Sequence, residues 1–167
     1  MHIPSRKFRC NHAYIDGANL HKGTMSLGWR VDYKKFYVWL RDKYRIKRAY
    51  IFLGYLPEFD RTYARMSEAG FLVRFREITR DADGKIKGNC DTDMAVRCVR
   101  DVQESIFDQA VIISGDGDFD CLVRYLQEKD KMAGILSPNR WCSILLLKTG
   151  ASLVYLDDFK EYVDFHG

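Results

Sequence analysis

The chain has 167 residues, of which 47% are hydrophobic and 30% are charged. This length suits one domain that buries roughly 70% of its unfolded surface. Its five cysteines form no CxxC pair, which excludes a disulfide framework and a zinc ribbon. The aliphatic run at residues 144–147 is too short for a membrane span, so we expect a soluble cytoplasmic protein. The net charge of +4 suits either an ordinary basic surface or a polyanionic partner.

Residues 1–10 contain three basic side chains without periodicity and are expected to form a flexible basic arm. We expect a single domain over residues 11–167. In its first half, a strand at residues 12–15 ends at Asp16, and a glycine-bearing loop follows at residues 21–30. A helix at residues 33–44 begins after the N-capping Asp32 and is expected to pack its aromatic residues in the core. The pattern then predicts a strand at residues 49–53, a helix at 58–69 and a strand at 71–75.

The second half continues the alternation. The segment at residues 74–88 is rich in basic residues, contains an Asp83-Gly84 turn and is interpreted as a solvated hairpin. A helix at residues 89–104 is expected to place Asp91 on its apolar face and Asp101 on its polar face. Strands at residues 110–113 and 132–136 enclose a helix, and a helix at 140–148, an edge strand at 153–156 and a helical turn at 157–163 complete the chain. Such alternation predicts an α/β fold with a parallel sheet.

Carboxylates stand at three separated places along this pattern. Asp16 follows the first strand, Asp91 begins a helix, and Asp116 and Asp118 follow the strand at residues 110–113. Because ligands bind at the carboxyl ends of parallel strands, we expect these side chains to meet in one crevice. Four carboxylates at one place require a cation, and an oxygen-only donor set favours Mg²⁺ or Mn²⁺ and phosphate chemistry. The alternatives are an Asx turn at Asp16 and a helix cap at Asp91.

The DxDxD run at residues 116–120 resembles two other motifs. It is not a calcium-binding EF loop, because Cys121 occupies the position of the required glycine. The phosphatase motif of the haloacid dehalogenase type is disfavoured. The run follows the fourth predicted strand, so little chain is left to supply the partner residues that such a phosphatase needs. A receiver-like phosphotransfer protein ranks low because it needs paired acids on the first strand, where only Asp16 is found.

Three segments together resemble a known family. YIDGANL at residues 14–20, KGNCDTDMAV at 87–96 and VIISGDGDFDCLV at 111–123 are similar to the NYN domain of the LabA-like group in the PIN-like nuclease superfamily. The resemblance implies a three-layer α/β/α sandwich with a mostly parallel sheet of five or six strands. It also implies a divalent-metal-dependent endoribonuclease, with the acidic cluster on Asp16, Asp91, Asp116 and Asp118, and with Asn19 and Ser114 supporting it.

We therefore predict an enzyme that hydrolyses RNA phosphodiester bonds with Mg²⁺ or Mn²⁺. The predicted catalytic residues are Asp16, Asn19, Asp91, Asp116 and Asp118, of which the four aspartates bind metal. The residues predicted to contact RNA are Lys87, Ser114, Arg76, Arg80 and Arg140. Members of the superfamily often dimerise, so a homodimer is a further expectation. The alternative function is a non-catalytic RNA-binding module of the same fold.

Overall fold

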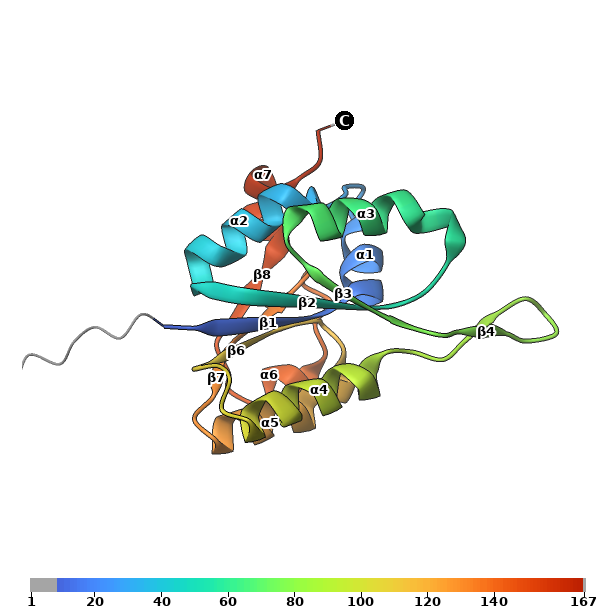
Figure 1. The fold of residues 1–167 in the computed structure, drawn as a ribbon. Helices are drawn as coiled ribbons and strands as arrows, with labels where there is room; N and C mark the ends of the chain where they lie inside the picture. Colours follow the sequence, from blue (N-terminus) through green and yellow to red (C-terminus); the bar gives the residue numbers. More distant parts are fainter. Residues whose placement is uncertain (1–8, 167) are drawn as a thin grey trace, which may run out of the picture.

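Six parallel strands form the central sheet of the computed structural model, which describes residues 9–166. Their order is β3-β2-β1-β6-β7-β8, so β1 and β6 lie at the centre (Figure 1). The strands are β1 (Asn11–Asp16), β2 (Ile46–Gly54), β3 (Leu72–Arg76), β6 (Ala110–Ile113), β7 (Met132–Ser137) and β8 (Leu153–Tyr155). This arrangement confirms the predicted parallel sheet. The predicted basic arm at residues 1–10 lies almost wholly outside the described residues.

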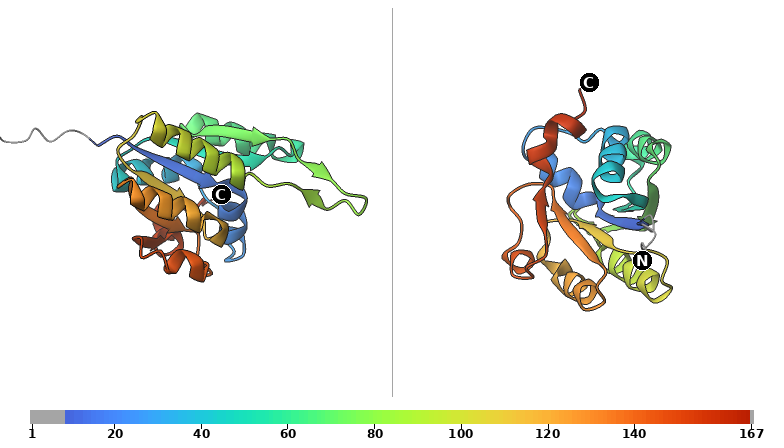
Figure 2. Two further views of the ribbon diagram at one scale, coloured as in Figure 1. Left: turned by 90° about the horizontal axis from the view of Figure 1, so that it is seen from below. Right: turned by 90° about the vertical axis from the view of Figure 1, so that its left-hand side faces the viewer.

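Helices cover both faces of the sheet, as Figures 1 and 2 show. One face carries α1 (Gly17–Met25), α2 (Tyr33–Tyr44), α3 (Asp60–Ala69) and α7 (Lys160–Val163), and the other carries α4 (Asp91–Gln103), α5 (Asp120–Glu128) and α6 (Ile144–Leu147). Short 3₁₀ turns, Pro57–Phe59, Gly117–Phe119 and Leu156–Phe159, precede α3, α5 and α7. The molecule is therefore a three-layer α/β/α sandwich, as expected. None of the helices within residues 9–166 is long and apolar enough to cross a membrane.

The alternation of side chains along β1 divides the core into two clusters. Ala13 and Ile15 face the α1, α2 and α3 layer, whereas Tyr14 faces α4. On the first face, Asp32 caps α2 by accepting a hydrogen bond from the Lys35 backbone N–H at 3.0 Å. Phe36, on the inner side of α2, is fully buried. The predicted capped helix and its core face are thus confirmed.

The loop predicted at residues 21–30 is wrong, because residues 17–25 form α1. The Asp16 carboxylate caps this helix by accepting from the Asn19 backbone N–H. Leu20 and Thr24, one helical turn apart, are buried against the sheet. Capping and burial outweigh the low helix propensity of the glycines in this segment.

The expected position of Asp101 on the polar face of α4 is also wrong. Asp101 is 1% exposed, and it accepts a hydrogen bond of 2.6 Å from the Tyr14 hydroxyl. The Arg97 guanidinium donates to the same carboxylate at 3.1 Å. Burial of the charge is tolerated because both partners satisfy its oxygen atoms.

The segment between β3 and α4 forms a hairpin of β4 (Thr79–Arg80) and β5 (Ile86–Lys87), which are antiparallel. The Asp81 side chain accepts hydrogen bonds from the backbone N–H groups of Asp83 and Lys85 and closes the predicted turn. Figure 2 shows that the hairpin extends away from the body of the molecule. The predicted solvated hairpin is confirmed, and its basic side chains are exposed.

Candidate metal centre

Three carboxylates meet at the carboxyl edge of the central strands. Ile15 pairs with Ile113 in the register of β1 and β6, so Asp16 and Ser114 follow at the same level. Asp116 lies in the turn after β6. Asp91 is the first residue of α4, which covers the face of the sheet away from α1. One carboxylate oxygen from each of Asp16, Asp91 and Asp116 lies within 4.8 Å of the other two. We call these three residues the acidic triad.

Asp16 is the most buried member of the triad, with 8% of its surface exposed. Its two carboxylate oxygens accept hydrogen bonds from the Asn19 backbone N–H at 3.1 Å and from the Ser114 hydroxyl at 3.3 Å. Burial raises the pKa of Asp16, whereas these two hydrogen bonds oppose the rise. The next residue must be small, because a Cβ atom on Gly17 would lie 2.9 Å from the Phe52 carbonyl oxygen.

Asn19 and Ser114 link the first acidic motif to the last. The Asn19 side-chain oxygen accepts a hydrogen bond of 2.8 Å from the Gly115 N–H. The Ser114 hydroxyl accepts one of 3.1 Å from the Asp116 N–H, while it donates to Asp16. Ser114 is fully buried, so this position suits the supporting role that the family resemblance implies and not a contact with RNA. The two side chains fix Asp16 and Asp116 relative to each other.

The pKa of Asp91 is raised well above its ordinary value. Burial, followed by the charges of Asp16, Asp116 and Asp118, raises its pKa to about 6. Clustered carboxylates of this kind repel one another unless protons or cations neutralise them. Three hard oxygen donors from separate segments are the ligand type that Mg²⁺ and Mn²⁺ prefer. The donor set of the triad therefore fits a divalent metal ion.

Asp118 lies outside the acidic triad. Its side chain is exposed in the 3₁₀ turn that precedes α5, whereas we expected it to meet the other three carboxylates in one crevice. Its backbone N–H donates to the Asp116 carboxylate at 2.9 Å. The charge of Asp118 nevertheless contributes to the raised pKa of Asp91, which places it within electrostatic range of the triad.

The four basic residues predicted to bind RNA are all exposed. Lys87 lies on β5 of the hairpin. The other three make surface ion pairs, namely Arg76 with Asp93 at 3.2 Å, Arg80 with Glu58 at 3.7 Å and Arg140 with Asp158 at 2.7 Å. Exposed pairs of this kind are weak enough to exchange for a phosphate. Their contact with RNA stays a prediction.

A groove of about 1140 Å³ runs past the acidic triad and along α1 and α3. Its lining includes three residues that we did not select from the sequence, His21, Lys22 and Phe59. His21 and Phe59 contact each other edge to face, with ring centroids 6.0 Å apart. Lys22 could have been selected from the sequence if residues 17–25 had been predicted as a helix. It lies three residues after Asn19 and therefore on the same helical face.

The six-stranded parallel sheet, its two helical layers and the acidic triad at its carboxyl edge define a PIN-like α/β/α fold. The family model of the NYN domain matches residues 13–145, and the chain belongs to this family of the PIN-like nuclease superfamily. This match confirms the family that the three sequence motifs indicated.

Two individual proteins resemble this chain at low identity. The low amplitude and bright protein LabA of Synechococcus elongatus is 22% identical over an alignment of 161 residues, and the match covers 90% of this chain and 86% of LabA. A crystal structure of a protein of unknown function from Vibrio parahaemolyticus is 20% identical, with a TM-score of 0.79. That similarity covers 96% of this chain and 99% of the Vibrio chain, and it supports the fold alone.

Proposed function

We propose that this protein is a divalent-metal-dependent endoribonuclease. The observation that carries the proposal is the convergence of Asp16, Asp91 and Asp116 within 4.8 Å at the carboxyl edge of the sheet. The three residues come from separate segments of a chain that belongs to a family in the PIN-like nuclease superfamily. RNA is the substrate that this family membership favours.

In the proposed mechanism, the acidic triad holds the ion, and Asp118 adds a fourth negative charge beside it. A bound Mg²⁺ or Mn²⁺ supplies Lewis-acid polarisation of a phosphoryl oxygen and makes water a better nucleophile at neutral pH. Ser114 and Asn19 keep Asp16 and Asp116 in position through the hydrogen bonds described above. Lys87 and the exposed arginines attract the phosphate backbone, so RNA binding should weaken as the salt concentration rises.

The test is RNA cleavage by the wild-type protein and by Asp116→Asn, with Mn²⁺, Mg²⁺ or EDTA. We expect the substitution to reduce cleavage at least 100-fold, because removal of one ligand or electrostatic partner typically costs that much. Circular dichroism should show an unchanged fold, because Asp116 lies in a partly exposed turn.

The matched control is Asp120→Asn in the same acidic run. Asp120 pairs with Arg124 at 3.9 Å and lies outside the acidic triad, so this variant should keep its cleavage rate. Cleavage that survives in EDTA or in Asp116→Asn contradicts the proposal. Equal RNA binding with Mg²⁺ and with EDTA, without any cleavage, identifies the protein as a non-catalytic RNA-binding module.

A further inference from the structure

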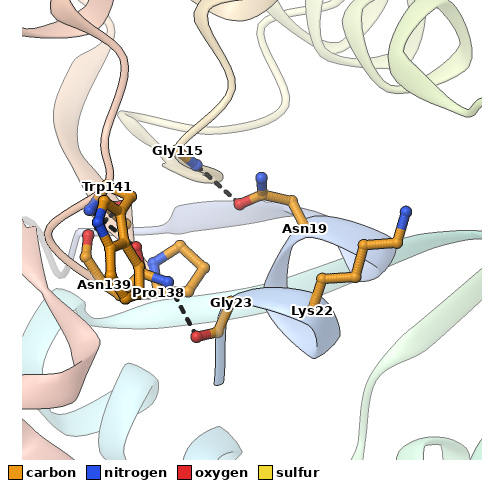
Figure 3. Close-up of a pocket in the computed structure, with 8 residues that line it drawn as sticks. Asn19, Lys22, Gly23, Gly115, Pro138, Asn139 and Trp141 are labelled. Carbon is orange, nitrogen blue, oxygen red and sulfur yellow. Dashed lines mark hydrogen bonds between the residues drawn. The ribbon is translucent and has the colours of Figure 1, made fainter. Parts of the chain in front are cut away.

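A small pocket lies between α1 and the loop that follows β7 (Figure 3). Asn19 and Lys22 of α1 form one side, and Pro138 and Trp141 lie across from them. The volume is about 220 Å³, below the roughly 300–1,000 Å³ of pockets that enclose drug-sized ligands. The space is of the size that one ring system needs.

The pocket adjoins the acidic triad through two of its lining residues. Gly115 immediately precedes Asp116, and its N–H donates to the Asn19 side chain at 2.8 Å. The backbone N–H of Asn19 in turn donates to Asp16. Asn19 and Lys22 also line the larger groove, so the pocket and the groove meet at these residues. A chain molecule that lies along the groove past the triad can therefore place its next unit in the pocket.

Hydrogen bonds within the protein preform the far wall. The Asn139 side chain donates to the Gly23 carbonyl oxygen at 2.9 Å and accepts from the Trp141 N–H at 2.9 Å. The Ser137 hydroxyl donates to the Asn139 carbonyl oxygen at 2.7 Å. Helix α1 approaches this wall closely at Gly23. A Cβ atom at this position would lie only 2.5 Å from Pro138 Cβ. The wall is in place before any ligand arrives.

The side chains around the pocket have the chemistry that recognises a nucleotide. Trp141 exposes 73% of its surface, although tryptophan is usually buried. An exposed indole offers an aromatic face on which any base can stack. The ammonium group of Lys22 is exposed and makes no ion pair within residues 9–166, so it is available to a phosphate. The Asn19 amide nitrogen adds a neutral donor.

We propose that this pocket binds an unpaired nucleobase, stacked on Trp141, from the nucleotide next to the phosphate at the acidic triad. This inference rests on the proposed function and adds a base-binding subsite to it. A base inside a duplex is stacked and paired, and it cannot enter a protein pocket unless it leaves the helix. A base within a duplex therefore does not reach Trp141, and only an unpaired nucleotide fills this subsite.

The experiment measures the affinity of a fluorescently labelled single-stranded RNA dodecamer for the Asp116→Asn protein, in which we expect cleavage to be strongly reduced. Adding Trp141→Ala should weaken binding roughly 10-fold, as expected for the loss of one base–aromatic stack. Trp141→Phe keeps an aromatic face and should recover most of the affinity. Tyr162→Ala is the matched control, because Tyr162 is 63% exposed on α7 and does not line either cavity. It should bind like its parent.

A second measurement identifies the base as the partner of Trp141. A dodecamer series with one abasic nucleotide, moved along the strand, should contain one position that weakens binding as much as Trp141→Ala does. At that position the abasic change should have no further effect on the Trp141→Ala protein. A fully duplex version of the RNA should bind the parent protein at least 10-fold more weakly than the single strand.

The outcomes separate this inference from the proposed function. Wild-type cleavage with unchanged affinity and KM in Trp141→Ala overturns the pocket assignment and leaves the nuclease intact. Trp141-dependent binding without wild-type cleavage supports the pocket and overturns the nuclease. Equal binding of duplex and single strand, or no binding of either, overturns the assignment of an unpaired base.

Discussion

Asp91 is strongly affected by the repulsion between the carboxylates at one edge of the sheet. Its ordinary pKa is 3.8, and burial together with three neighbouring aspartates raises it to about 6. The folded chain therefore keeps a proton on Asp91 at pH values where the unfolded chain has already released it. The contribution of Asp91 to the stability of the metal-free protein is therefore present at low pH and is lost as the pH rises from about 4 through about 6.

We predict that Asp91→Asn raises the melting temperature of the metal-free protein above pH 6. The reason is that asparagine removes the charge whose ionisation is unfavourable in the folded state, and the gain should disappear as the pH falls towards 4. Thermal melts in EDTA between pH 4 and pH 8 measure the effect. The control is Asp93→Asn. Asp93 is exposed on the same turn of α4, so this variant should not show the pH-dependent rise in melting temperature. A lower melting temperature for Asp91→Asn at pH 7.5 would contradict the explanation.

Single residues also mark where sequence reasoning succeeds and where it stops. The candidate aspartates are recognisable because each follows an apolar strand or begins a helix. The sequence does not show which of these aspartates come together. Asp116 and Asp118 are two residues apart in a turn, and the conformation of that turn decides which one points to Asp16. Asp101 was misplaced for a similar reason. Its burial depends on a hydroxyl from β1 that lies 87 residues away in the sequence.

At the scale of elements, the strands could be predicted because central strands of a parallel sheet are buried on both faces and form continuous apolar runs. Residues Ala110–Ile113 are an example, since all four are fully buried. Helix α1 could not be predicted in this way. Its glycines weaken the local signal, and its stability comes from the Asp16 cap and from burial of Leu20, which both require the folded sheet.

The hairpin of β4 and β5 is the element that we expect to contribute most to salt-sensitive RNA binding. We predict that the double variant Lys85→Ala and Lys87→Ala binds single-stranded RNA more weakly at low salt. The slope of log affinity against log salt concentration should decrease by roughly 1.4, because two phosphate contacts are lost. Titrations from 50 to 300 mM KCl with the Asp116→Asn parent measure this slope.

The control for the hairpin is the double variant Lys47→Ala and Arg48→Ala. These exposed residues are the second and third of β2, at the end of the sheet away from the acidic triad, and they carry the same total charge as Lys85 and Lys87. Their loss should leave the slope nearly unchanged. If both double variants lower the slope equally, the net charge of the protein and not the hairpin determines binding.

At the scale of the whole molecule, a metal ion at the triad would join the two helical layers through the central sheet. Asp91 belongs to α4 on one face, and Asp16 caps α1 on the other. An ion that binds only the folded chain stabilises it by about 2.7 kcal/mol when its concentration is 100 times its Kd.

We predict that saturating Mn²⁺ raises the melting temperature by roughly 5–10 °C, the shift that this free energy produces in a chain of this size. Differential scanning calorimetry with and without EDTA measures the rise. It should be absent in Asp116→Asn and retained in Asp120→Asn. An equal rise in all three proteins would indicate that manganese binds elsewhere.

The hydrogen bond between Ser114 and Asp16 joins residues that are 98 positions apart in the chain. During synthesis from the amino terminus, β1 leaves the ribosome long before β6 can pair with it. A growing polypeptide therefore carries Asp16 without the partners that complete the acidic triad. If the chain is the ribonuclease proposed above, it should be unable to cleave the messenger being translated until about two thirds of its own length has been made, because Ser114 and Asp116 are then still missing.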